Sequence, residues 1–382
     1  MNHGTKQGCV LAPTLFTLFL TIVLTILHQQ VDDGVYIRTR SDGKLFNLAR
    51  LKARTRTQTK LITELLFADD TALIAHDPVK MQELVDVFAE TTKKLGLKIN
   101  IGKTEVMYQP SPSNPDPYEP VIKIDDEPLK VVQNFKYLGS MISSDNVVDR
   151  EINGRIQSAS AAFGKLEKRL WKRKGVRLPT KCKVYKAVVI PALLYSAETY
   201  TLYRKHIRKL EAVQQRHLRR ILGIKWSDYI SNVEVLRRAG LQSIEAILAS
   251  TQLRWTGHVA RMGEDRIPKA VFYGELTEGS RRVGGQKLRY KDVAKRHMKS
   301  MNIDVDGWEE LAADRTKWRS ALHRGKEVIE EKITNASNQR HYRRHNPGTH
   351  QCQLCDQMYH TEKGLHQHQR LKHRIPPSHR QP

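Results

Sequence analysis

The chain has 382 residues, 39% of them hydrophobic, and a formal net charge of +25. This length allows two or three domains and at least one sizeable core. Only four cysteines occur, which excludes a disulfide framework and indicates a reducing compartment. Residues 1–150 carry 18 basic and 18 acidic side chains, so the whole positive excess lies in residues 151–382. Such an excess predicts a polyanionic partner, usually nucleic acid. An anionic membrane is a weaker alternative, because no lipidation signal accompanies it.

The first predicted element is the apolar stretch "VLAPTLFTLFLTIVLTIL", residues 10–27. Its composition suits a signal peptide or a membrane span. However, it is at the short limit for a span, and it lacks an A-x-A-like cleavage site. Thr14, Thr17, Thr21 and Thr25 are three or four residues apart and therefore line one face of a helix. We expect a buried helix with a slightly polar seam.

The stretch "LITELLFADDTALIAHD", residues 61–77, predicts two strands joined by a turn, with Asp69 and Asp70 at its tip. Taken alone, paired aspartates favour a turn, because their side chains form local hydrogen bonds. The alternative is catalytic: phosphoryl transfer on nucleic acids uses carboxylates to hold two divalent ions about 4 Å apart. A hairpin tip between apolar strands would hold such carboxylates rigidly.

Further strands and one helix complete the first part of the chain. Residues 78–96 predict a helix with Met81, Leu84, Val85 and Phe88 on one face and Gly96 as its C-terminal cap. The segments that follow are a strand with a small turn at 97–108, a surface loop with five prolines at 109–120, and strands at 121–124 and 135–143. This order predicts an α+β sheet layer.

Beyond residue 150 the pattern changes to long amphipathic helices. In residues 204–223 one face is apolar and arginines and lysines surround it; the apolar positions are Ile207, Leu210, Val213, Leu218 and Ile221. Residues 278–292 predict a basic, glycine-containing loop. The basic cluster "KRLWKRKGVR", residues 168–177, is either a localisation signal or a face of this helical region.

The last segment has the ligand spacing of a zinc site, Cys352-x2-Cys355-x12-His368-x4-His373. Zinc takes four such ligands in a tetrahedron. Tyr359 and Leu365 stand where a small ββα finger buries its core, so a chance histidine-rich tail is the weaker interpretation. His366 is too far from His373 to replace His368 in this spacing.

The finger is a poor candidate for reading a base sequence. Its helix positions −1, 3 and 6 are Thr361, Gly364 and Gln367. Glycine has no side chain to read a base, and one finger buries little DNA surface. We interpret it as a nucleic-acid clamp or a structural staple.

Several motifs in order resemble the reverse transcriptases of non-LTR retrotransposons. "KQGCVLAPTLFTLFL" is similar to the family's QG-x-x-x-x-P-x-LF segment, "FADD" to its acidic hairpin, and "LGLKINIGKTEVM" to the segment after its palm helix. "FKYLGSMIS" and "EINGRIQSASAAFGKL" look like the primer-contacting turn and the start of the thumb, and "LRWTGHVARM" like the C-terminal region.

This resemblance implies roles for individual residues. Asp69 would be a ligand of divalent magnesium and Asp70 its partner, while Gln7 and Gly8 would lie beside the templating base and the incoming nucleotide. Lys103 would lie near the phosphates of that nucleotide, although alone it could be a surface lysine.

The resemblance also implies a primer grip at Tyr137, Leu138 and Gly139, which taken alone read as an ordinary strand end. The family's palm has a further aspartate on a strand before the QG segment, and only six residues precede Gln7. We therefore expect this chain alone to be inactive as a polymerase.

Two classes of function stay open. The chain is either the C-terminal part of a retrotransposon RNA-directed DNA polymerase or a non-enzymatic zinc-finger protein, derived from such an element, that binds RNA or DNA. In the first class it would be a remnant, a fragment, or a chain whose upstream portion is separately encoded. In both cases we expect structural Zn²⁺, no membrane partner, and a nuclear or cytoplasmic rather than secreted protein. Magnesium is expected only if the polymerase is competent.

The expected architecture is α+β, with a truncated palm, a basic and mainly helical thumb and C-terminal region, and a ββα zinc finger. The expected boundaries are 1–150 for the partial palm, 151–334 for the helical region, 335–349 for a polar linker, 350–374 for the finger and 375–382 for a tail.

Overall fold

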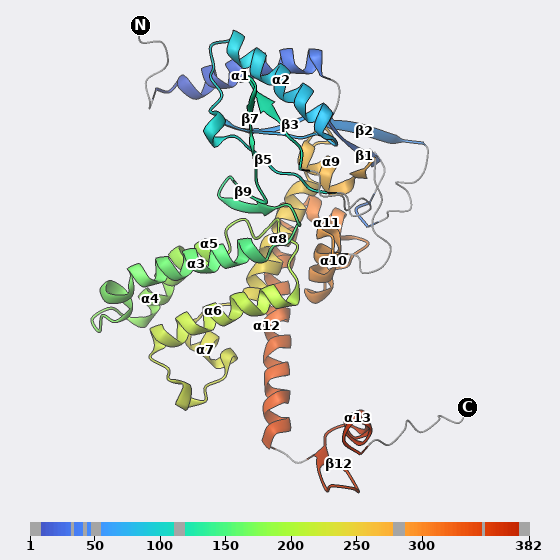
Figure 1. The fold of residues 1–382 in the computed structure, drawn as a ribbon. Coiled ribbons are helices and arrows are strands. Elements are labelled where there is room, and N and C mark those ends of the chain that lie inside the picture. Colours follow the sequence, from blue (N-terminus) through green and yellow to red (C-terminus); the bar gives the residue numbers. More distant parts are fainter. Residues whose placement is uncertain are drawn as a thin grey trace.

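The computed structural model describes residues 9–31, 34–40, 44–46, 55–110, 119–277, 287–345 and 348–373. Two N-terminal helices and several short strands form one end of the molecule, and a larger helical body follows (Figure 1). One long helix leaves that body and leads to a small C-terminal unit (Figure 1). The structure thus combines helices and sheets, as the sequence predicts.

The first helix, α1 (Ala12–Gln30), is not the buried helix that we expected. Among its side chains only Val23 and Leu27 are buried, whereas Leu18 is 58% exposed. One face packs against α2 (Pro78–Lys94), and the described residues supply no second layer to cover the other. The hydroxyls of Thr17, Thr21 and Thr25 donate to carbonyl oxygens four residues back in the same helix, so these polar groups need no partner outside it. By length and composition alone, α1 is the one described helix that could cross a membrane.

The acidic hairpin and the helix after it form as predicted. Strands β3 (Glu64–Phe67) and β4 (Asp70–Leu73) pair in an antiparallel hairpin. The Asp77 carboxylate accepts from the backbone N–H of Lys80 at 2.9 Å and caps α2. Gly96 follows the helix with φ of 79°, the left-handed conformation that ends helices and favours glycine.

The predicted sheet layer is wrong in form, because most of its strands make separate pairs. These pairs are β5 (Glu105–Val106) with β8 (Lys130–Val131), β6 (Lys123–Ile124) with β7 (Glu127–Pro128), and β9 (Asn134–Tyr137) with β10 (Ser140–Ser143). Each of these strands has only two to four residues. The apolar core here is correspondingly small, with Val85, Ile122, Ile124 and Leu129 buried.

The largest sheet among the described residues joins the first part of the chain to the helical part. Strand β1 (Val35–Arg40) pairs with β2 (Thr57–Ile62) on one edge and β11 (Glu275–Leu276) on the other. Next to this sheet, Leu45 is 1% exposed and packs into the helical body. Its backbone N–H donates to Glu309 at 3.1 Å. Residue 150 is therefore not a packing boundary for this sheet.

The helical body contains the main hydrophobic cores. Its α-helices are α3 (Asp149–Lys165), α4 (Leu178–Val184), α5 (Ile190–Leu193), α6 (Arg204–Leu222), α7 (Asn232–Ala239), α8 (Ile244–Ala260), α9 (Ile267–Tyr273), α10 (Tyr290–Ser300), α11 (Trp308–Ala313) and α12 (Arg315–His345). Between them lie two short π-helices, η3 (Glu167–Trp171) and η4 (Tyr185–Val189), and a 3-10 helix, η5 (Trp226–Asp228). The predicted apolar face of α6 is confirmed, since all five of its apolar positions are buried.

Two segments differ from their predicted form. Residues 335–345 of the expected linker are helical, because α12 continues to His345. Alanine and the long polar side chains of this stretch favour a helix even though most of it is exposed. Of the basic loop predicted at 278–292, residues 278–286 lie outside the described residues, and residues 290–292 begin α10.

Candidate catalytic hairpins and metal centre

The two aspartates lie at the tip of the β3–β4 hairpin. Phe67 pairs with Asp70, which leaves Ala68 and Asp69 as the two-residue turn. Ala68 has φ of 53°, in the left-handed region that such tight hairpin turns require. Both aspartates are exposed. Both carboxylates therefore face solvent. Asp69 lies in the turn and Asp70 begins β4, and the strand pairing fixes the backbone of both.

A second hairpin lies against the first. Leu138 and Gly139 form the turn between β9 and β10, and both have positive φ, 47° and 79°. The hydroxyl of Tyr137 donates to the carbonyl oxygen of Leu65 in β3 at 3.3 Å. Burial raises the pKa of Tyr137, and the nearby carboxylate of Asp70 raises it further. The structure thus brings together two of the sequence-predicted groups.

A network from the helical body holds the second hairpin, and sequence reasoning missed it. Glu151 in α3 accepts from the backbone N–H of Met141 at 2.6 Å and pairs with Arg155. Arg155 donates in turn to the carbonyl oxygen of Gly139. Tyr195 donates to Leu138 O at 3.2 Å, and the Arg155 guanidinium lies 4.4 Å from the Tyr195 ring centroid. The four-residue spacing of Glu151 and Arg155 was the available signal.

The remaining polymerase-like positions are less informative. Gln7 and Gly8 lie outside the described residues. Lys103 ends the 3-10 turn η2 (Ile101–Lys103), where its backbone N–H donates to Asn100. Its side chain is exposed, and within the described part of the chain no hydrogen bond or ion pair joins it to Asp69 or Asp70.

The acidic hairpin offers part of a magnesium site. Carboxylate oxygens are the ligands that Mg²⁺ prefers, so Asp69 and Asp70 suit it chemically. Among the described residues, however, the one group of three or more His, Cys, Asp or Glu side chains close enough to share an ion lies elsewhere. The hairpin therefore needs a further oxygen ligand to hold two ions.

That group is the predicted zinc set. The ligand atoms of Cys352, Cys355, His368 and His373 all lie within 4.8 Å of one another. Nε2 of His368 is 3.1 Å from Sγ of Cys355 and 3.1 Å from Nε2 of His373. The usual bond lengths give a zinc tetrahedron edges of about 3.3–3.8 Å, so the two 3.1 Å separations are slightly shorter than the edges of a metal-bound site. Two thiolates and two imidazoles in this arrangement fit Zn²⁺.

The scaffold around this set has the ββα form. Strands β12 (His350–Gln351) and β13 (Met358–Tyr359) pair, and α13 (Glu362–Lys372) follows. The Thr361 hydroxyl accepts from Gly364 N and caps α13. The ring centroids of Tyr359 and His368 are 4.7 Å apart. The predicted start of this helix is thus confirmed. Of the three predicted base-contacting positions, Thr361 and Gln367 are exposed and the one between them is Gly364.

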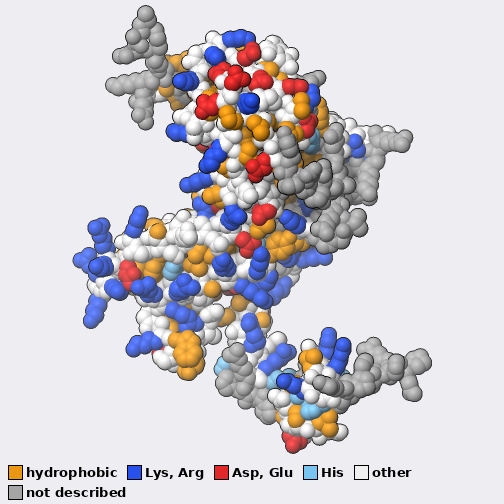
Figure 2. Space-filling model, viewed as in Figure 1, with side chains coloured by type: hydrophobic (Ala, Val, Ile, Leu, Met, Phe, Trp, Pro, Cys, Tyr) orange, Lys and Arg blue, Asp and Glu red, His pale blue; other side chains and the backbone are white. Residues whose placement is uncertain are grey.

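Basic side chains gather over the helical body. Figure 2 shows acidic side chains concentrated over the end of the molecule that carries α1 and α2, and lysines and arginines over the part that carries α3 to α7. A surface pocket of about 420 Å³ lies in that part. Its charged lining consists of one acid, Glu167, and five cations: Lys165, Lys168, Arg169, Lys172 and Arg220.

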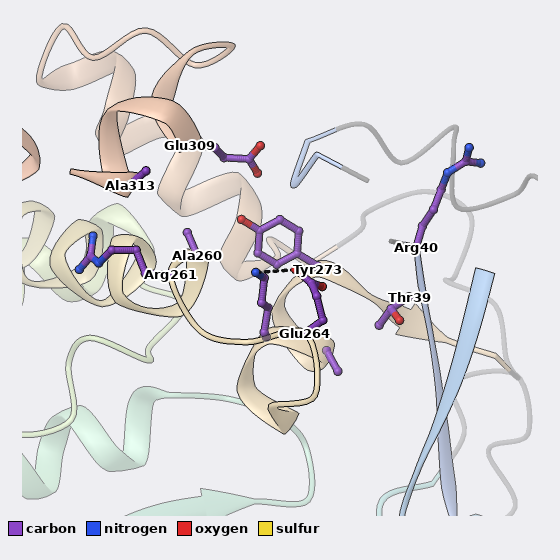
Figure 3. A pocket seen from close by; sticks show the side chains of 10 residues that line it. Thr39, Arg40, Ala260, Arg261, Glu264, Tyr273, Glu309 and Ala313 are labelled. Atoms are coloured by element: carbon purple, nitrogen blue, oxygen red, sulfur yellow. Dashed lines mark ion pairs between the residues drawn. The ribbon is translucent and has the colours of Figure 1, made fainter. Parts of the chain in front are cut away.

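A second pocket, of about 290 Å³, lies where β1 meets α8, α9 and α11 (Figure 3). Lys269 pairs with Glu264 across it at 2.7 Å, and Tyr273 lies between them and Glu309 (Figure 3). Burial is the main reason that the pKa of Tyr273 is raised. This ion pair joins α9 to the segment that precedes it and neutralises both charges, so we assign the pocket no ligand.

Comparison with known proteins shows what the chain is similar to. The family described as "Reverse transcriptase (RNA-dependent DNA polymerase)" matches residues 1–142, the segment that carries both hairpins. An uncharacterised transposon-derived protein of Caenorhabditis elegans is 25% identical over 288 residues, 70% of this chain and 98% of that protein. The RNA-directed DNA polymerases from mobile element jockey of Drosophila funebris and Drosophila melanogaster are 26% and 24% identical, over 59% and 58% of this chain.

These matches confirm the resemblance of the chain to the reverse transcriptases of non-LTR retrotransposons. The aligned part of this chain spans only 22% of the length of either jockey polymerase. The matched family segment ends at residue 142, within β10. The network of Glu151 and Arg155 therefore links the matched segment to helices that lie beyond it.

Proposed function

We propose that this chain supplies the metal-binding hairpin, the primer-contacting hairpin and the nucleic-acid-binding helices of an RNA-directed DNA polymerase. The observation that carries the proposal is the hydrogen bond between Tyr137 and Leu65, which joins the two hairpins. A primer end held at Leu138 and Gly139 would then lie beside the carboxylates of Asp69 and Asp70. This is the arrangement that a reaction at a primer end requires.

In this proposal the aspartates hold magnesium, which would neutralise charge on the reacting phosphate. The chain's own contribution is positioning. The strand pairing fixes the two carboxylates, and Arg155 and Glu151 fix the turn that faces the primer. Lys103 is proposed to approach the nucleotide phosphates, and Gln7 and Gly8 to contact the template and nucleotide bases.

Binding of RNA or DNA is proposed for the helical body. Its support is the excess of +25 that lies entirely in residues 151–382, together with the five cations of the basic pocket. Affinity that rests on phosphate contacts falls steeply with salt. We expect a loss of at least tenfold between about 50 and 200 mM salt. An affinity that stays constant over this range would contradict the assignment.

The C-terminal unit is proposed to be a zinc-stabilised clamp or staple. Its support is the cluster of two cysteines and two histidines on a ββα scaffold. Glycine at the central contact position of α13 argues against reading of a base sequence.

Primer extension tests the catalytic part of the proposal. The purified chain is given an RNA template, a DNA primer, magnesium and nucleotides, with Asp69→Ala as the matched variant. Extension that disappears in the variant supports the polymerase role. Because the described residues bring no third carboxylate to the hairpin, we expect no extension by this chain alone.

A non-enzymatic role in nucleic-acid binding is the second candidate, and the same missing ligand favours it. In that case the hairpins serve only as a scaffold. Addition of a separate polypeptide that carries the remaining palm strands distinguishes the two. Restored extension that depends on Asp69 favours the polymerase, whereas salt-sensitive binding without any extension favours the binding protein.

A further inference from the structure

Two aromatic side chains stand exposed on the loop between α6 and α7. Trp226 is 85% exposed and Tyr229 is 82% exposed. Their ring centroids are 5.6 Å apart, with an interplanar angle of 51°. The other tryptophans are less exposed: Trp171, Trp308 and Trp318 are each at most 3% exposed, and Trp255 is half-buried. Large rings left in water bring the fold no burial energy, so they need another explanation.

The turn that carries the rings is well fixed. The Asp228 carboxylate accepts from the backbone N–H of Lys225 at 2.8 Å, and the N–H of Tyr229 donates to the carbonyl oxygen of Trp226. The Arg219 guanidinium donates to Ile230 O at 2.7 Å and also to Asn232 Oδ1. The rings are therefore presented on a defined turn, which reduces the entropy lost when a ligand stacks on them.

The surroundings of this turn are basic. Lys225 precedes Trp226 directly, and Arg219 and Arg220 form the last turn of α6. Arg220 also lines the basic pocket, six residues before Trp226. Six residues span at most about 20 Å, so the rings and the pocket lie within a few nucleotides of each other.

Aromatic rings beside cations are the elements that bind single-stranded nucleic acid without sequence preference. A base of a single strand has an open face that can stack on a ring, whereas bases in a duplex are already stacked. An apolar protein partner would need a contiguous apolar patch rather than two rings in a basic setting.

We propose that Trp226 and Tyr229 form a stacking platform for unpaired bases of single-stranded RNA or DNA, whose phosphates run over the basic pocket of Lys165, Lys168, Arg169, Lys172 and Arg220. This inference rests on the proposed binding of nucleic acid by the helical body and names its substrate as single-stranded. In an RNA-directed polymerase, such a strand is the unpaired template outside the duplex.

Fluorescence anisotropy with the full chain tests this. The probes are a labelled single-stranded RNA of about twelve nucleotides and a blunt duplex of the same length. The variant is Trp226→Ala combined with Tyr229→Ala. The matched control is Tyr342→Ala, which removes a ring that is 63% exposed in α12. Urea unfolding confirms that each variant is folded.

We expect the double variant to bind the single strand about tenfold more weakly or worse, which is the usual loss for a stacked base. Binding of the duplex should change less than twofold, and the control should behave as the unaltered chain. The salt dependence should also stay the same, because no phosphate contact is lost. By contrast, Lys168→Gln with Arg169→Gln should reduce the salt slope for the single strand by about 1–2.

Three outcomes would overturn the inference: unchanged affinity of the double variant, an equal loss on the duplex, or an equal loss in the control. If the unaltered chain binds neither probe even at low salt, both the proposed binding function and this inference fail. If the unaltered chain binds the single strand and the double variant binds it equally well, the binding function stands and the platform does not.

Discussion

The hydroxyl of Tyr137 donates a hydrogen bond to the carbonyl oxygen of Leu65 and thereby joins two hairpins that are 72 residues apart in sequence. Burial raises the pKa of the Tyr137 phenol, and the negative charge of Asp70 raises it further. The pKa of Tyr137 is therefore sensitive to the distance between the two hairpins in solution.

Asp70→Asn should therefore lower the pKa of Tyr137, because a charge that opposes ionisation is removed. The pKa should still stay above the ordinary value of 10.0, since burial is the larger cause. NMR titration of ¹³C-labelled tyrosine, assigned with Tyr137→Phe, measures this. Asp69→Asn is the matched control and should have the smaller effect. If the two variants changed the pKa of Tyr137 equally, Asp70 would not be the carboxylate that lies nearer to Tyr137, and the described packing of the two hairpins would be wrong.

The carboxylate of Glu151 should be essential for holding the second hairpin. Its side chain is 6% exposed and that of Arg155 is 13% exposed, and Met141 N and Tyr200 OH also donate to it. Glu151→Gln leaves the Arg155 charge without its partner, so we expect a loss of unfolding free energy on the order of 3 kcal/mol. Urea unfolding measures it.

The control for that prediction is Glu83→Gln. It breaks the pair with Lys80, which has a similar geometry at 2.9 Å but side chains 54% and 43% exposed. A surface pair contributes about 0–1 kcal/mol. If both variants lose the same stability, the network around Glu151 does not act as a buried pair.

The sequence predicted local elements well and long-range packing poorly. The acidic hairpin, α2, the face of α6 and the ββα unit each depend on neighbouring residues, whose periodicity and capping are visible in the chain. The exposed face of α1 and the pairing of β1 with β11 depend on what lies opposite, and no local pattern encodes that. The candidate site residues follow the same rule: motifs predicted Asp69 and Gly139, whereas no motif pointed to Tyr195 or Trp226.

Leu45 provides a test of the long-range packing. It is 1% exposed in the core that also contains Trp308 and Trp318, although it belongs to the first 150 residues. Leu45→Ala should lower the unfolding free energy by about 2–4 kcal/mol, because it leaves a cavity in that core. Leu15→Ala in α1 is the control, since Leu15 is 50% exposed and its loss should cost little. A small effect at Leu45 would mean that this segment folds apart from the helices.

Stability should fall as the pH is lowered from about 6.5 to about 4. Burial lowers the pKa of His217 to about 4, and Arg216 and Arg220 contribute to this. Burial likewise lowers the pKa of His297 to about 4, with a smaller contribution from Arg296. In this window the unfolded chain binds protons that the folded chain cannot, so protonation favours unfolding.

Each of these two histidines should account for a loss on the order of 3 kcal/mol across the full window. His217 stacks on Phe163 with ring centroids 4.1 Å apart, so His217→Phe keeps a ring there and removes the titration. Urea midpoints at several pH values should then show a shallower slope. His323→Gln, at an exposed position of α12, should leave the slope unchanged.

Removal of zinc should unfold the C-terminal unit and leave the helical body intact. Within this unit Cys352 is buried but α13 has no buried residue, so the metal must supply most of its stability. We expect one zinc ion per chain by elemental analysis, and loss of amide-exchange protection in residues 350–373 after chelation.

His368→Ala should lose the zinc. His366→Ala should retain it, because His366 faces Glu362 instead and is not part of the ligand cluster. Protection that survives both chelation and His368→Ala would show that the ββα unit folds without a metal, and the zinc assignment would then be wrong.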